Sequence, residues 1–281
     1  MPRYRRGINQ SKIERRLAEG RGQGEGAEYN PWHHIQDFPS RGRVHRIKGW
    51  LHGRVHHLFS DLELHIFLTY LWSRNVVVDI REQYPLLPLE ETLAIAETLG
   101  VRHPTDPRTK HPVVLTTDFF LTIRHPLANT YEPRTAKYLD DFLQPRTLEK
   151  LEIERCYWKC RNKDLRIVTE QHLPLVLIQN VAWVRPYFWL TDLYPLSQLT
   201  VNKIASELTS KVISTDVPLK DLAAINDAQL GLKRGTSIAV VRHLIANEVW
   251  QVNMHAPIQL RAPLTLLSDP KGSLCQQKIV A

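Results

Sequence analysis

Apolar residues recur at helical spacing in three stretches between residues 60 and 170, and short apolar or β-branched runs of strand length lie between them. Such an alternation of helices and short strands is typical of an α/β fold built around a mixed sheet. A shorter helical pattern precedes it near the N-terminus. The helices are expected at 11–20, 61–72, 90–99 and 145–160, and the strands at 76–80, 83–87, 113–123, 133–138 and 165–169.

The pattern changes after Gln171. A largely apolar stretch interrupted by Pro186 comes first, and three helical patterns and two β-type runs follow it. Three helices followed by a β-hairpin is the element order of a winged helix-turn-helix module. We therefore expect an α/β domain with a basic N-terminal arm over residues 1–170, and a winged-helix-like domain over residues 171–281. In the second domain the apolar stretch spans 173–187, the helices 199–213, 218–231 and 235–247, and the β-type runs 249–253 and 258–267.

The positive charge is concentrated at the start of the chain. The formal net charge is +8, and residues 1–60 hold twelve Lys and Arg residues against five acids, a surplus of seven. A basic segment of this kind is typical of proteins that bind a polyanion such as DNA, although a solubilising tail would explain the charge alone equally well. The candidate DNA contacts are Arg15, Arg16, Arg21, Arg54, His56 and His57.

Composition also narrows the class of protein. The hydrophobic fraction of 43% supports a packed core, and no apolar run approaches the roughly 20 residues of a membrane span. The cysteines Cys156 and Cys160 are too widely spaced for a zinc knuckle pair. The third cysteine, Cys275, is alone, so the sequence holds no second cysteine pair to complete a zinc site. Reduced thiols in a cytoplasmic protein are therefore expected.

Two acidic residues stand out against the expected elements. Glu63 shares a helical face with Ile66 and Phe67, and a carboxylate buried there would need a partner such as a metal ion. The stretch 60–63 also fits a capping box, and considered alone this capping role is favoured for Glu63. Asp118 follows an apolar and threonine-rich run, although aspartate is depleted in strands, and a strand bend would explain it as well.

Lys137 lies on the next expected strand, where by itself it would be a solvent-facing lysine. Adjacent strands can place it beside Asp118, with the backbone carbonyl of Ala136 directed at the same point. Phosphodiester cleavage needs oxygen ligands for Mg²⁺ or Mn²⁺, a water of lowered pKa and stabilisation of the pentacoordinate phosphate. Glu63, Asp118 and the Ala136 carbonyl can supply the ligands, and Lys137 can orient the water or neutralise charge. Together these residues predict a metal-dependent nuclease site of the restriction-endonuclease-like kind.

Longer stretches of the sequence resemble one family, TnsA, the endonuclease subunit of heteromeric cut-and-paste transposases. The resemblance covers most of residues 11–160 and extends to the C-terminal third much less clearly. It implies a restriction-endonuclease-like N-terminal domain in which Glu63 and Asp118 bind Mg²⁺ and Lys137 assists catalysis. The matching text comprises residues 19–24, 53–58, 60–64, 79–88, 117–119, 146–152 and 157–158.

Two further positions qualify the resemblance. The family has Gln or Glu two residues before the lysine, whereas this chain has Thr135. Either the threonine hydroxyl or a water replaces that ligand, or the site binds its metal with one fewer side chain. Glu154 matches a position that looks functional in the family, although a surface salt bridge with Lys150 one helical turn earlier would explain it more simply.

The resemblance also implies partners. The chain would nick the strand carrying the five-prime transposon end of double-stranded DNA, while a TnsB-like DDE transposase cuts the other strand. The C-terminal domain would dock a TnsC-like AAA+ ATPase. Two other functions stay open, a free-standing restriction-type endonuclease and a catalytically silent DNA-binding assembly factor, the second because of Thr135.

Overall fold

The computed structural model describes residues 7–37 and 43–267, and the chain divides after Leu173 into two compact units. Each unit is described by itself. Within the described residues, no helix is long and apolar enough to cross a membrane.

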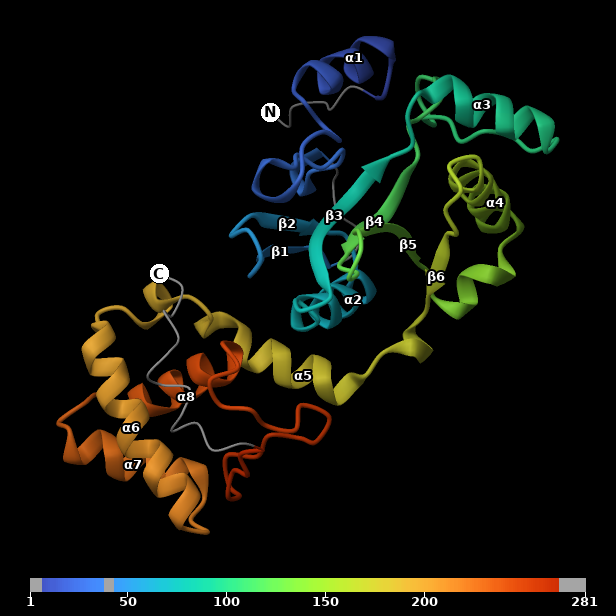
Figure 1. The fold of residues 1–281 in the computed structure, drawn as a ribbon. Coiled ribbons are helices and arrows are strands. Elements are labelled where there is room, and N and C mark those ends of the chain that lie inside the picture. Colours follow the sequence, from blue (N-terminus) through green and yellow to red (C-terminus); the bar gives the residue numbers. More distant parts are fainter. Residues whose placement is uncertain (1–6, 38–42, 268–281) are drawn as a thin grey trace. The chain divides into compact units, whose positions relative to one another are not determined.

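A four-stranded mixed sheet forms the centre of the N-terminal unit (Figure 1). The strand order is β3-β4-β5-β6, with antiparallel pairing between the first three strands and parallel pairing between the last two. The mixed sheet predicted from the sequence is therefore confirmed. The two runs expected at 76–80 and 83–87 form one continuous strand. The strands span β3 (Val77–Pro85), β4 (Thr116–Ile123), β5 (Thr130–Ala136) and β6 (Arg166–Val168).

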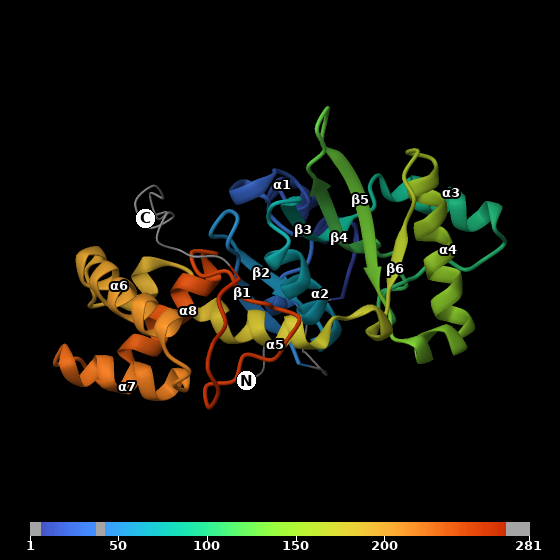
Figure 2. The ribbon, with the colours of Figure 1, turned by 60° about the horizontal axis from the view of Figure 1, so that its bottom comes forward.

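Helices cover both faces of this sheet. Neighbouring residues of a strand point to opposite faces, and Phe119 packs on Tyr70 of α2 (Asp61–Trp72) while Phe120 stacks on Trp158 of α4. Figure 2 shows α3 and α4 together on one side of the sheet. These two helices span α3 (Leu89–Thr98) and α4 (Pro145–Lys159).

Local sequence signals fix the helix ends. The side chain of Ser60 accepts a hydrogen bond from the Glu63 amide at 3.0 Å, as expected of an N-cap. Gly100 follows the C-cap of helix α3, and its φ of +65° lies in the left-handed region that glycine adopts at little cost. Pro145 occupies the first turn of α4, where a missing amide proton leaves no bond unmade.

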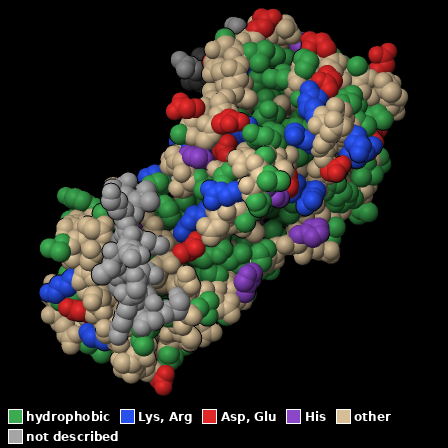
Figure 3. Space-filling model, in the orientation of Figure 1, with side chains coloured by type: hydrophobic (Ala, Val, Ile, Leu, Met, Phe, Trp, Pro, Cys, Tyr) green, Lys and Arg blue, Asp and Glu red, His purple; other side chains and the backbone are tan. Residues whose placement is uncertain are grey.

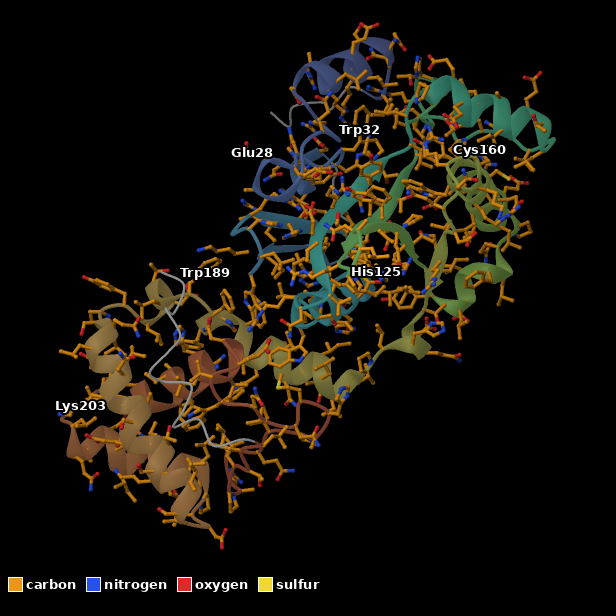
Figure 4. The ribbon with its side chains drawn as sticks, in the orientation of Figure 1. Glu28, Trp32, His125, Cys160, Trp189 and Lys203 are labelled. Carbon is orange, nitrogen blue, oxygen red and sulfur yellow. The ribbon has the colours of Figure 1, made fainter. Side chains whose placement is uncertain are left out.

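The N-terminal segment packs against the α/β unit. Ile13 of α1 (Gln10–Ala18) shares a buried cluster with Trp32, Leu89 and Val114, and Trp32 is labelled in Figure 4. Of the expected basic arm, residues 1–6 and 38–42 lie outside the described residues. A small antiparallel pair, β1 (His45–Lys48) and β2 (Val55–Leu58), precedes α2. Short 3-10 helices in this unit span Gly26–Glu28, Ile35–Asp37, Leu139–Leu143 and Glu170–His172.

Helices make up the regular structure of the C-terminal unit. The last of them supplies much of its core, since Val240, Val241, Leu244 and Ile245 are at most 1% exposed. The three helical patterns predicted after residue 198 are confirmed. The helices span α5 (Leu175–Val184), α6 (Gln198–Ser214), α7 (Leu219–Gln229) and α8 (Thr236–Ala246), with 3-10 turns at Arg185–Tyr187 and Leu190–Leu193.

The β-type runs expected at 249–253 and 258–267 form no strand in the described residues of this unit, so the predicted wing is wrong. The side-chain amide of Asn180 on α5 donates to the carbonyls of Met254 and Ala256, at 3.0 and 2.8 Å. The first amides of α7 bind further carbonyls of the same segment. Several of its carbonyl groups are therefore satisfied without a strand ladder.

Candidate active site

Glu63 lies in the first turn of α2 and is only 7% exposed. Its carboxylate accepts hydrogen bonds from the Phe59 amide at 3.0 Å and the Ser60 hydroxyl at 3.2 Å. The side-chain amide of Gln83 on β3 approaches the same group at 3.4 Å. The buried position is therefore present, whereas the expected capping bond from the Ser60 amide is replaced by bonds from the Phe59 amide and the Ser60 hydroxyl.

Asp118 and Lys137 lie at neighbouring ends of β4 and β5. One Asp118 oxygen, Oδ2, accepts from the Thr135 hydroxyl at 2.9 Å and from the Ala136 amide at 2.7 Å. The Lys137 Nζ lies 3.4 Å from this oxygen and donates to the Ala136 carbonyl at 2.8 Å. None of these bonds uses Oδ1 of Asp118.

Glu154 reaches the same place from α4 and is 6% exposed. It accepts a hydrogen bond from the Thr117 hydroxyl at 2.7 Å, and Thr117 in turn accepts one from the Trp158 indole at 2.7 Å. The simpler interpretation, a surface salt bridge with Lys150, is wrong because Glu154 is buried and bonded to Thr117.

Glu63, Lys137 and Glu154 line one cleft of about 410 Å³, and Asp118 lies beside it in contact with Lys137. Glu63 and Glu154 approach it from helices on opposite faces of the sheet, and Lys137 from the end of β5. The remaining lining comes mainly from the N-terminal half of α4 and the segment before it. The cleft is lined by Ser60, Leu62, Glu63, Leu115, Thr116, Ala136, Lys137, Tyr138, Asp141, Thr147, Lys150, Leu151 and Glu154.

Burial and mutual repulsion perturb the ionisation of the cleft. Desolvation, followed by the nearby charge of Asp118, raises the pKa of Glu63 to about 8 and that of Glu154 to about 8. Burial alone would lower the pKa of Lys137, but Asp118 and the two glutamates outweigh it and raise that pKa above its ordinary value. Crowded carboxylates that cannot all ionise are typical of a functional site that takes up a cation.

The donor atoms suit a hard divalent cation. Glu63, Asp118 and Glu154 offer carboxylate oxygens, and the Ala136 carbonyl has a second lone pair beside its bond to Lys137. Within the described part of the chain, no three His, Cys, Asp or Glu side chains are close enough to form a preassembled metal cage. The set therefore fits Mg²⁺ in chemistry, with room for substrate and water oxygens to complete the ligands.

Four of the six expected DNA contacts are buried in ion pairs. Arg16 is 2% exposed and pairs with Asp37 at 3.2 Å, and Arg21 bonds both Asp37 and Glu19. In this conformation these guanidinium groups hold the N-terminal segment together and do not reach the surface. On the face drawn in Figure 3, Lys and Arg side chains of the N-terminal unit lie interspersed among Asp and Glu side chains.

The other two buried contacts, Arg54 and His56, surround Glu82 on β3, which is fully buried. Arg54 binds both of its oxygens at 2.7 Å, and the His56 Nδ1 lies 2.8 Å from one of them. Burial, with help from His34, lowers the pKa of His57 to about 4, so His57 is neutral at pH 7. Arg15, with 65% of its side chain exposed, is the expected contact that lies open to solvent.

Gln83 is a site residue that sequence patterns did not single out. Its φ of +51° is in the left-handed region, which is uncommon for a residue other than glycine inside a strand. This conformation accompanies the contact with Glu63 and a bond from the Thr116 hydroxyl at 3.3 Å. The alternation of apolar and polar residues along a strand does not indicate a left-handed residue, so only the backbone geometry of the structure reveals it.

Known proteins place this site in context. A family described as "TnsA-like endonuclease N terminal" matches residues 74–170, and one described as "TnsA endonuclease C terminal" matches residues 173–254. "Transposon Tn7 transposition protein TnsA" from Escherichia coli is 34% identical over 258 residues, which cover 88% of this chain and 88% of that relative. The first match includes Asp118, Lys137 and Glu154 but begins after Glu63.

With a mixed α/β fold and a carboxylate-lysine cleft inside an endonuclease domain, the chain is a nuclease. The two domain matches and the relative from Tn7 define it further. The chain belongs to the TnsA family of transposition endonuclease subunits.

Proposed function

We propose that this chain is a metal-dependent DNA endonuclease that nicks the strand carrying the five-prime transposon ends. The observation that carries the proposal is the convergence of Glu63, Glu154 and Lys137 on one cleft, with Asp118 held against Lys137 beside it, in a chain of an endonuclease family. Glu63 and Asp118, with the Ala136 carbonyl and support from Glu154, would hold Mg²⁺ or Mn²⁺, which supplies positive charge and a water of lowered pKa.

The protein groups have separate tasks in this proposal. The Thr135 hydroxyl and the Ala136 amide fix Asp118 through Oδ2, which leaves Oδ1 for the cation. Thr135 thereby acts as a positioning group where the family has a longer polar side chain. The Lys137 ammonium stays protonated at neutral pH, because its pKa is raised, and neutralises charge that develops on the phosphate.

The partners follow from the family. A TnsB-like DDE transposase would cut the other strand of the double-stranded DNA, and a TnsC-like AAA+ ATPase would dock on the C-terminal unit. That unit contributes helices rather than the expected wing, so the helical surface is the proposed docking face.

The test compares a site carboxylate, Asp118, with an exposed control carboxylate, Asp140, in a transposase reconstituted with both partners. Asp118→Asn should lower Mg²⁺-dependent nicking at least roughly a hundredfold, since it removes a cation ligand. Asp140→Asn, on the nearby 3-10 helix and without the bonds to Thr135, Ala136 and Lys137 that Asp118 makes, serves as the matched control and should nick normally. Normal nicking by Asp118→Asn would refute the site, and no nicking by the wild type with either metal would favour the silent assembly factor.

A further inference from the structure

A second hollow, of about 460 Å³, lies next to the catalytic cleft in the N-terminal unit. Lys150 lines both hollows, so they adjoin one another along α4. The second hollow is formed by the start of α4 and the loop that follows α3, two helices that lie side by side in Figures 1 and 2. It is lined by Arg102, Pro104, Thr105, Arg146, Glu149 and Lys150.

Charge sets this hollow apart from the cleft. It holds three cations, Arg102, Arg146 and Lys150, against the single carboxylate of Glu149. Arg146 is already paired with Glu149, but no hydrogen bond or ion pair with a described residue involves the side chains of Arg102 or Lys150. Two cations are therefore directed into an open hollow without a protein counter-ion.

The adjoining cleft creates a need for such cations. Besides Lys150, the one cation in the lining of the cleft is Lys137, and it is engaged with Asp118, so the cleft itself offers an approaching phosphate chain little attraction. A basic groove that meets the cleft at Lys150 would supply that attraction. Phosphate contacts of this kind position a strand without reading its sequence.

The helix sets the distances. Lys150 lies one turn and Arg146 two turns before Glu154, roughly 6 and 12 Å along the axis. A strand of B-DNA advances 3.4 Å per nucleotide. For a duplex whose axis follows α4, these cations lie roughly two to four nucleotide steps from a phosphate held at Glu154.

We infer that the groove of Arg102, Arg146 and Lys150 binds the phosphates of duplex DNA two to four nucleotides from the bond to be cut. The inference rests on the proposed function, because it takes the cleft as the place of the cut. It gives the DNA interface a location on α4 in place of the buried arginines of the N-terminal segment.

The test uses two double variants of the same helix in the full chain. Arg146→Gln with Lys150→Gln removes two groove cations. Arg155→Gln with Lys159→Gln is the matched control, because each residue lies nine positions later, on the opposite face, and Arg155 loses the same kind of i,i+3 pair, with Glu152. Lys150→Gln alone is included, because the Lys150 side chain makes no hydrogen bond or ion pair with a described residue whose loss would disturb folding.

Binding to duplex DNA is measured in chelator over a range of salt. The groove variant should lower the slope of log affinity against log salt by about two, roughly one for each lost phosphate contact, and the control should keep the wild-type slope. Equal slopes for the groove variant and the wild type, or a wild type that binds no tighter than the groove variant, would overturn the inference.

A second measurement locates the contact. Neutral methylphosphonates replace single phosphates two to four nucleotides from the cut. These should weaken binding of the wild type several-fold and that of Lys150→Gln less, whereas equal losses in both proteins would contradict the inference. If the wild type nicks the five-prime strand but the groove variant keeps the wild-type salt slope, only the inference about the groove is refuted. If the groove variant lowers the slope but the wild type does not nick, only the proposed function is refuted.

Discussion

The carboxylate of Glu63 binds the residues just before α2 and forms a wall of the cleft at the same time. The sequence predicted either a local bond to the N-cap residue or a buried site, because a capping box and an apolar helical face overlap at this position. It could not choose between them, since capping needs only local bonds whereas burial depends on residues far along the chain. The structure shows that the Phe59 amide and the Ser60 hydroxyl use the carboxylate while it lines the cleft.

The raised pKa values predict an unusual pH dependence of stability in metal-free protein. For Glu63 and Glu154 the folded pKa of about 8 lies above the unfolded value of 4.5. Their stabilising contribution is therefore fully present below about pH 4.5 and is lost as the pH rises through about 8. In chelator, these two groups should make the unfolding temperature a few degrees lower at pH 8 than at pH 5. Bound Mg²⁺ should oppose this loss of stability.

Two variants isolate this effect. Glu154→Gln cannot ionise and should flatten the decline between pH 5 and pH 8. Glu152→Gln, on the exposed side of α4, should not, because bonding to Arg155 lowers the pKa of Glu152. An identical pH profile for the wild type and Glu154→Gln would show that Glu154 does not carry a raised pKa.

Gln83 provides a second prediction at the residue scale. Gln83→Gly would relieve the left-handed conformation but remove the contact with Glu63, so stability should change by no more than about 1 kcal/mol. The affinity for Mg²⁺ in nicking assays should nevertheless fall roughly tenfold to a hundredfold, as for other residues that orient ligands. Asn162→Gly is the control, because Asn162 has a similar φ of +53° outside the site. Equal metal dependence in both variants would leave Gln83 with a purely structural role.

At the scale of elements, short-range patterns predicted more than long-range ones. Helix α2 spans the expected residues 61–72, because its cap and its apolar spacing are written in adjacent positions. The basic N-terminal segment was predicted to contact DNA because its charges are visible in the sequence. Their partners are not visible there, since Arg54 meets Glu82 only when β2 packs beside β3.

The C-terminal runs illustrate the same limit. Apolar alternation at 249–253 suits a strand, but it equally suits an irregular segment that buries Trp250 and Val252. Asn180, about 75 residues earlier in the chain, binds the backbone of the segment that follows. No local pattern announces such a partner.

The Glu82 cluster predicts how strongly β2 is tied to β3. Glu82→Gln would leave Arg54 without its buried counter-ion and should lower the free energy of unfolding by roughly 3–5 kcal/mol. Glu25→Gln removes the solvent-exposed partner of Arg81, which keeps Asp79 as a second partner, and should cost less than about 1 kcal/mol. Chemical denaturation measures both. Similar losses for the two variants would mean that the cluster does not hold the strands together.

At the scale of the whole molecule, the family match and the site support each other. The two matched domains fall on either side of residue 173, where the chain divides into its two units. The proposed nuclease groups lie in the first unit, and the proposed partner surface lies in the second. Thr135, where the resemblance led us to expect Gln or Glu, donates a hydrogen bond to Asp118, and this bond is the basis of its proposed positioning role.

The central claim is that this chain itself cuts the five-prime strand, and one measurement tests it most directly. Transposon-end DNA labelled on each strand is incubated with Mg²⁺, the ATPase and a DDE partner whose own catalytic carboxylates have been removed, so that any nick comes from this chain. The account predicts nicks at the five-prime ends alone with the wild type, and none in chelator or with Asp118→Asn. Absence of nicks with the wild type, or nicks that persist with Asp118→Asn, would contradict it.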